Sequence, residues 1–178
     1  MKKENMHKEQ KLVRPVVNRI LLAVCILVFI NILISAYSIY EFYNPSQESF
    51  CSINDTFNCA TVAESDYAIF IGVPVAIWGA LFYTGLFIGT LGVLLNWPFW
   101  KIYKKLRPGA VLDILRYFSF FGVLFSLYLT YAEAFVINVY CPLCLAQQAL
   151  ILVIAGLYVW VNAAINKGKK ETKVCEFC

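Results

Sequence analysis

The sequence predicts an all-α membrane protein, a four-transmembrane-helix bundle with an extracytoplasmic loop between helices 1 and 2. Of its 178 residues, 61% are hydrophobic and 15% are charged, and the mean hydropathy is +0.68. These values lie outside the range of soluble domains. A spanning helix needs about 20 mostly apolar residues, and four segments reach that length: residues 16–40, 72–96, 115–135 and 141–162. Their length and the lack of period-two alternation argue against barrel strands.

The distribution of Lys and Arg predicts which ends of the spans face the cytoplasm. Basic residues precede the first span, lie between spans two and three, and follow the fourth, whereas residues 41–71 contain acidic residues but no Lys or Arg. Basic residues accumulate on the cytoplasmic side of a membrane, so we expect both termini inside. Residues 41–71 and the connection between spans three and four then face outward. The net charge of +4 follows from this topology and requires no nucleic-acid partner.

The first span has one alternative interpretation, a cleaved signal peptide. Its basic start and apolar centre fit such a peptide. However, the apolar run is long, and no clear small-x-small cleavage site follows it. We therefore expect the segment to be retained as a helix, and the outward position of residues 41–71 is the same in either case.

The connection at residues 41–71 is the one long loop on the outer side. Loops of this length are usually functional or disordered, and this loop carries apolar side chains such as Phe50, Ile53 and Phe57. Residues 60–65 are expected to form a short helix. We therefore expect the loop to lie against the mouth of the bundle as a lid.

Four of the seven cysteines fall on the outward side: Cys51, Cys59, Cys141 and Cys144. An oxidising exterior permits disulfides, whereas the cytoplasm keeps thiols reduced. Four cysteines allow three pairings, and proximity in the sequence favours one pair within the loop and one at the start of the fourth span. Among the others, Cys25 is expected to be an inert apolar residue. Cys175 and Cys178 lie in a Lys-rich cytoplasmic tail, expected to be reduced, with an intermolecular metal site as the alternative.

The pair at the start of the fourth span has the spacing of a reactive disulfide. Cys141 and Cys144 are three residues apart and share one face of a helix, and Pro142 suits the first helical turn. Free N–H groups and the dipole at a helix N-terminus favour a thiolate at Cys141. A static structural bond is the alternative. A metal site is not expected, because the one histidine, His7, is on the cytoplasmic side.

The loop pair has two interpretations. Taken alone, Cys51 and Cys59 fit a structural disulfide as well as a reactive one. Beside a second pair on the same side of the membrane, a relay is favoured, because thiol–disulfide exchange passes two electrons stepwise between pairs that touch.

Together these motifs resemble the vitamin K epoxide reductase family, which includes bacterial and archaeal thiol:quinone oxidoreductases. The resemblance covers nearly the whole chain. It rests on the following residues: Cys51 and Cys59, then Val62, Ser65 and Tyr67, then Gly72-Val73-Pro74-Val75-Ala76, and finally Cys141-Pro142-Leu143-Cys144. The bacterial quinone reductase that partners a periplasmic oxidase carries its two cysteine pairs in the opposite order.

The resemblance implies a helix bundle around a quinone pocket, with a quinone of the menaquinone, ubiquinone or phylloquinone type as acceptor. By position, Cys51 would exchange with a thioredoxin-fold protein, Cys59 would attack Cys141, and Cys144 would face the quinone. Ser65 matches a family hydroxyl near these cysteines, which is expected to polarise one of them or to hold the loop, and Ser65 is predicted together with Gln148 to form part of the quinone-binding site. Many bacterial relatives carry a fused thioredoxin domain, whereas this chain ends soon after the fourth span, so a separate partner is expected.

The resemblance also bears on the substrate. The vertebrate branch binds its quinone through an Asn in the second span and a Tyr one turn after the active-site pair; the matching positions here are Val75 and Gln148. Gln148 has the hydrogen-bonding groups to bind a quinone oxygen, but Val75 lacks them. Plain quinone reduction is therefore favoured. Quinone-epoxide reduction with the same cysteines and a non-catalytic scaffold with structural disulfides are the alternatives.

These inferences divide the chain into three parts. Residues 1–15 are expected to form a cytoplasmic segment, residues 16–166 a four-helix transmembrane catalytic domain with its outer loop at 41–71, and residues 167–178 a cytoplasmic tail. The Gly-x-Pro-x-Ala opening of the second span favours a prokaryotic plasma membrane.

Overall fold

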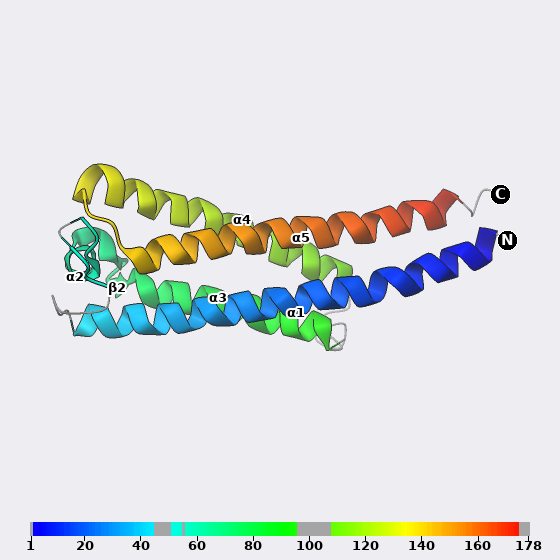
Figure 1. The fold of residues 1–178 in the computed structure, drawn as a ribbon, viewed down its shortest axis with the longest axis horizontal. Helices are drawn as coiled ribbons and strands as arrows, with labels where there is room; N and C mark the ends of the chain where they lie inside the picture. The colour runs from blue at the N-terminus through cyan, green and yellow to red at the C-terminus, as the bar shows by residue number, and fades with distance from the viewer. Residues whose placement is uncertain (1, 45–50, 55, 96–107, 175–178) are drawn as a thin grey trace.

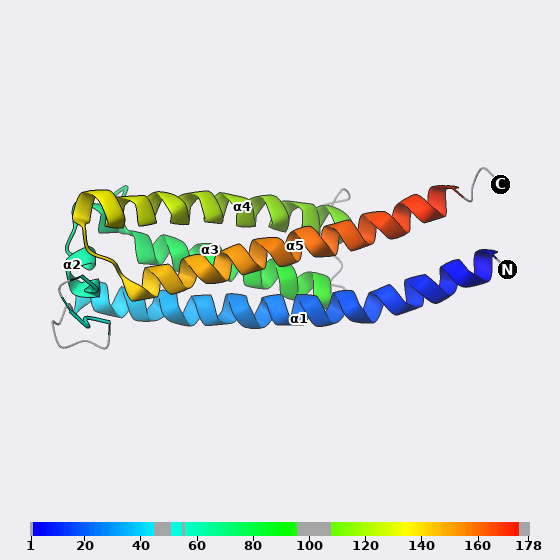
Figure 2. The same cartoon turned by 45° about the horizontal axis from the view of Figure 1, so that its top comes forward.

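The computed structural model describes residues 2–44, 51–54, 56–95 and 108–174, with side chains over 15–44, 51–54, 56–95 and 110–166. Four long helices form the molecule: α1 (Lys2–Tyr43), α3 (Val75–Leu94), α4 (Pro108–Ala132) and α5 (Pro142–Val174). The four helices lie lengthwise beside one another, with both termini at one end (Figure 1). Turned by 45°, the bundle shows α5 running between α4 and α1 (Figure 2).

The four predicted spans are confirmed. Helices long and apolar enough to cross a membrane cover Pro15–Tyr43, Val75–Leu94, Ala110–Ile137 and Pro142–Asn166. The third begins earlier than predicted, because the helix also includes residues 110–114, among which Asp113 is charged. The second begins later, at Val75, because the residues before it form a short hairpin. The protein is a multi-pass membrane protein.

The hairpin is an addition to the predicted all-helical fold. β1 (Ile69–Phe70) pairs antiparallel with β2 (Val73–Pro74), and the two residues between them have positive φ, 54° at Ile71 and 74° at Gly72. Two such residues are typical of the tight turn that matches strand twist. Pro74 then ends the strand as the N-cap of α3. The hairpin therefore connects the loop directly to the second span.

The connection between α4 and α5 is short. A π-helix, η3 (Glu133–Ile137), continues α4 and ends at Asn138, whose φ of 55° lies in the left-handed region. Asn adopts that conformation more readily than most residues. The reversal at Asn138 lets α5 begin at Pro142, so the start of the fourth span lies at the same end of the bundle as the loop (Figure 1).

The core of the bundle consists of aliphatic side chains and a few interhelical polar contacts. Leu86, Ile154 and Tyr158 are fully buried in it, and the hydroxyl of Tyr158 bonds with Thr90 of α3. Gln147 of α5 donates to Ser35 Oγ of α1 at 2.7 Å. Such bonds help to join helices where lipid offers no competing partner.

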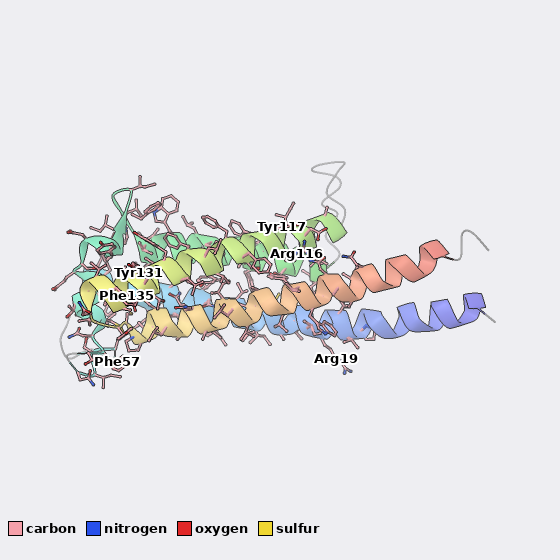
Figure 3. The ribbon with its side chains drawn as sticks, turned by 90° about the horizontal axis from the view of Figure 1, so that it is seen from above. Arg19, Phe57, Arg116, Tyr117, Tyr131 and Phe135 are labelled. Atoms are coloured by element: carbon pink, nitrogen blue, oxygen red, sulfur yellow. A yellow bond between two sulfur atoms is a disulfide. The ribbon has the colours of Figure 1, made fainter. Side chains whose placement is uncertain are left out.

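Charged and aromatic side chains mark the two ends of the bundle. Arg19 and Arg116 lie toward the end that carries the termini (Figure 3). Phe57, Tyr131 and Phe135 lie at the opposite end (Figure 3). The loop is therefore separated from these basic residues by much of the length of the spans.

Candidate active site

The loop between α1 and α3 contains a disulfide between Cys51 and Cys59, with 5.5 Å between the Cα atoms. This is the pairing that sequence proximity favours. A turn at Asn54 brings the two residues together, since its Oδ1 accepts the N–H groups of Thr56 at 3.0 Å and Phe57 at 2.8 Å. The two cysteines are eight positions apart in the sequence, so the chain reverses within that short stretch.

Asn58 fixes both sides of this disulfide. It is the N-cap of the short helix α2 (Cys59–Ala63), where its Oδ1 accepts the Thr61 N–H at 3.1 Å. The same oxygen accepts a bond from Ser52 Oγ at 3.0 Å. One side chain therefore joins the residue after Cys51 to the residue before Cys59. Of residues 60–65, which the sequence predicts to be helical, residues 60–63 belong to α2 and Glu64 is its C-cap.

A backbone bridge sets the position of Cys59 relative to the fourth span. Phe57 pairs with Tyr140 in a parallel bridge, in which the Asn58 N–H donates to the Tyr140 carbonyl at 3.1 Å and the Tyr140 N–H to the Thr56 carbonyl at 2.8 Å. The rings of Phe57 and Tyr140 also pack, with centroids 5.9 Å apart. Because Cys59 and Cys141 closely follow these paired residues, the bridge brings them face to face.

Three sulfur atoms meet at this point. Cys59 Sγ and Cys141 Sγ are 3.0 Å apart, and the sulfur atoms of Cys51, Cys59 and Cys141 all lie within 4.8 Å of one another. All three residues are at most 5% exposed. Cys141 and Cys144 are free thiols, so the bond expected between them is not formed in this state. The structure has one disulfide and two thiols, with one thiol against the disulfide.

Cys141 occupies the N-cap position of α5. Its carbonyl accepts the Leu145 N–H at 3.0 Å, and its sulfur accepts the Cys144 N–H at 3.4 Å. The pKa of the Cys141 thiol is lowered, chiefly by the hydrogen bond from the Cys144 thiol, while burial acts in the opposite direction. These surroundings stabilise the thiolate form of Cys141 relative to an ordinary cysteine, in the direction expected for a cysteine that starts a helix.

Glu133 contacts both of these cysteines. Its Oε2 accepts the Cys141 N–H at 3.2 Å, its carboxyl bonds with the Cys144 side chain, and it is 2% exposed. The sequence reasoning missed this residue. The available signal was a carboxyl group within an apolar span, which by itself suggests function. η3 holds this carboxyl in place beside the start of α5.

A cavity of about 90 Å³ lies beside the thiols, several times the 10–15 Å³ or so that one water molecule needs. Residues from five parts of the chain line it, and most of them are apolar: Ser38, Glu41, Phe42, Cys59, Val62, Ala63, Ser65, Tyr67, Ala68, Val75, Ala76, Leu129, Ala132, Glu133, Ile137, Cys141, Leu143 and Cys144. Apolar walls with a few polar groups are typical of sites for small organic molecules.

The two predicted quinone-binding residues differ in their position relative to this cavity. Ser65 lines it, and its hydroxyl donates to the Val62 carbonyl at 2.7 Å, which holds the loop after α2. Gln148 is not among the described residues of the cavity wall; its Oε1 accepts a bond from Thr130 of α4. Its role toward a quinone stays a prediction.

The same three sulfurs are close enough to share a metal ion. Zinc sites of this kind require deprotonated thiolates, and Cys51 and Cys59 are bonded to each other here. Their donor set therefore fits a metal only after the disulfide is reduced. Cys175 and Cys178 lie outside the described residues.

Four membrane spans, a disulfide and a facing thiol define a multi-pass membrane protein of the cysteine-dependent oxidoreductase class. The profile of the vitamin K epoxide reductase family matches residues 22–159, and the chain belongs to that family. The resemblance seen in the cysteine motifs is thereby confirmed. Among curated proteins, none matches the chain.

Proposed function

We propose that this protein is a thiol:quinone oxidoreductase that drives disulfide formation outside the membrane. Electrons pass from a separate thioredoxin-fold protein through Cys51 and Cys59 to Cys141 and Cys144, and then to a quinone in the lipid. The observation that carries the proposal is the distance of 3.0 Å between Cys59 Sγ and Cys141 Sγ. Cys59 Sγ is also one of the two sulfur atoms of the loop disulfide.

The transfer from the partner to the loop is a thiol–disulfide exchange. A thiolate of the partner attacks Cys51, and Cys59 leaves as a thiolate. The partner's second thiol then attacks the mixed disulfide, which oxidises the partner and leaves Cys51 and Cys59 reduced. The two electrons of the partner now reside on the loop pair.

The second exchange moves those electrons to the fourth span. Cys59 attacks Cys141 of a Cys141–Cys144 disulfide and releases Cys144, after which Cys51 attacks Cys59 and frees Cys141. The products are a loop disulfide and two thiols, the combination found in the structure. The lowered pKa of Cys141 makes it a good leaving group in this step.

The final acceptor is proposed from the surroundings of Cys144. This residue lines the apolar cavity together with Val75 and Leu129, and a quinone ring is itself apolar and reaches such a site through the lipid. When the two thiols reform their disulfide, a quinone takes up the two electrons and two protons. The site is proposed to face outward, because Arg19 and Arg116 lie toward the opposite end (Figure 3).

The test uses purified protein in lipid nanodiscs with a reduced thioredoxin-fold protein and 2-methyl-1,4-naphthoquinone, and measures loss of quinone absorbance. Wild type is expected to reduce the quinone, and Cys144→Ser is expected to abolish that reduction. Cys25→Ala, which changes a buried thiol of α1 outside the site, is the matched control and should retain it. Quinone reduction by Cys144→Ser at the wild-type rate, or none by wild type, contradicts the proposal.

The two alternatives give different products in the same preparation. A quinone-epoxide reductase converts a naphthoquinone epoxide to the quinone, which chromatography detects directly. A scaffold with a structural disulfide resists exchange with a glutathione or thioredoxin couple. Equilibration of the Cys51–Cys59 bond with such a couple, without epoxide conversion, supports the proposed reaction over both.

A further inference from the structure

The cavity beside the thiols contains polar atoms that no described side chain satisfies. Glu41, in the last turns of α1, is 3% exposed and lines the cavity, yet its Oε2 has no hydrogen-bond partner among the described residues. Ser38 Oγ, one turn earlier, lines the same cavity and also lacks a partner there. Buried polar atoms are normally paired, so these two atoms indicate a ligand with polar groups of its own.

The charge of Glu41 gives a second reason to expect a ligand. The hydroxyl of Tyr37 bonds with its carboxyl, but no Lys or Arg is among the described residues that line the cavity. The ion pair found in the described part of the chain, Arg116 with Asp113, lies on α4. A buried carboxylate without a cation is costly. A molecule that fills the cavity can supply the missing partner for this carboxyl.

The cavity is also lined by a second carboxyl group, which already has hydrogen-bond partners, and by a tyrosine from the loop. Glu133 bonds with Cys141 and Cys144, and Tyr67 enters from η1 (Asp66–Ala68). Glu41 is therefore the cavity carboxyl with an oxygen left for an incoming molecule. It comes from α1, whereas the cysteines come from the loop and α5, so a ligand between them touches both.

We propose that Glu41, assisted by Ser38, binds an oxygen of the quinone and delivers a proton to it. This inference rests on the proposed quinone reduction. The thiols of Cys141 and Cys144 give up two electrons and two protons as their disulfide forms, and the quinone gains both to become a hydroquinone. Glu41 transfers its proton to a ring oxygen and regains one that the thiols release, so it is unchanged over the cycle. The hydroxyl of Ser38 donates a hydrogen bond to the same oxygen.

Two substitutions at Glu41 separate binding from proton transfer. Leu removes both hydrogen bonding and the proton, whereas Gln keeps hydrogen bonding but has no proton to transfer. Binding of 2-methyl-1,4-naphthoquinone is measured by calorimetry in nanodiscs, with empty nanodiscs subtracted. The rate of quinone reduction is measured in a single turnover of protein whose Cys141 and Cys144 are reduced. Glu64→Leu and Glu64→Gln, at an exposed position after α2, are the matched controls.

We expect Glu41→Leu to weaken binding about tenfold and Ser38→Ala to weaken it a few-fold, as for lost hydrogen bonds in a buried site. Glu41→Gln is expected to keep the binding affinity but to slow reduction by about 10²-fold, the size of a general-acid contribution. The Glu64 variants should match wild type in both measurements. A melting temperature near that of wild type shows that a variant is folded, and the Ser38→Ala variant tests the binding site should Glu41→Leu fail to fold.

The outcomes distinguish this inference from the proposed function. Unchanged affinity in Glu41→Leu and Ser38→Ala, or no binding by wild type, overturns the binding role. A wild-type rate in Glu41→Gln overturns the proton transfer. Binding by wild type without any electron transfer overturns the proposed function and the proton transfer with it, while the comparison of affinities still decides whether Glu41 and Ser38 form the binding site.

Discussion

Replacement of Asn58 by Ala should loosen the segment that carries both loop cysteines, because one oxygen of this side chain holds it on two sides. The substitution removes the cap of α2, the bond to the Thr61 N–H, which is worth about 1 kcal/mol. It also removes the acceptor for Ser52 Oγ, worth about another 1 kcal/mol. A local loss of about 2 kcal/mol corresponds to an approximately 30-fold increase in the population of the opened segment.

The assay follows that opening directly. Amide hydrogen exchange over residues 59–63 should accelerate by about this factor, since exchange of a protected segment reports its opening free energy. Reduction of the Cys51–Cys59 disulfide by dithiothreitol should accelerate as well, because both cysteines are buried in the closed segment. Asn58→Asp keeps an acceptor oxygen and a good cap, so it should stay close to wild type.

The reasoning is refuted if Asn58→Ala leaves both exchange and reduction at wild-type rates. It is also refuted if Asn58→Asp is affected as strongly as Asn58→Ala, because the effect would then come from something other than the acceptor oxygen. Thr61→Ala retains the backbone N–H that the cap binds and is expected to behave as wild type.

Two further predictions concern single positions at the same end of the bundle. Cys144→Ala should raise the pKa of Cys141, because it removes the thiol whose hydrogen bond is the main cause of the lowered pKa; at neutral pH the thiolate fraction falls, and alkylation of Cys141, followed by mass spectrometry across a pH series, slows. Cys144→Ser keeps a donor, so an equal shift in both variants contradicts the explanation. Ile71→Asn should stabilise the protein by about 1 kcal/mol, because a β-branched residue at φ 54° is strained and Asn-Gly suits this turn. A lower melting temperature in that variant argues against strain at Ile71.

The membrane spans and the loop disulfide could be predicted from the sequence. Hydropathy depends on the composition of a segment and not on its neighbours, so four helices long enough to cross a membrane were predicted, with ends a few residues from those found. The pairing of Cys51 with Cys59 followed from their short separation in the sequence. The family followed from the order of the two cysteine pairs.

The hairpin before α3 could not be predicted from the local sequence. Gly72 and Pro74 were assigned to the start of a span by their apolar surroundings. The pairing of Ile69–Phe70 with Val73–Pro74 depends on positive φ at two successive residues, and Ile71 is a poor candidate for that conformation. Composition therefore gave no signal of the turn.

What the sequence determined by itself is a set of local properties: apolar length, the partition of basic residues, and cysteines placed together at one side of the membrane. What only the tertiary structure decided is which side chains meet. Cys59 and Cys141 are 82 residues apart, and their contact depends on the bridge between Phe57 and Tyr140. Likewise, the rotation of α5 about its axis places Gln148 against Thr130 of α4. Glu41 of α1 and Glu133 of η3 are far apart in the sequence but line the same cavity. Helix rotation and packing set these contacts, and neither is encoded in the hydropathy of any one segment.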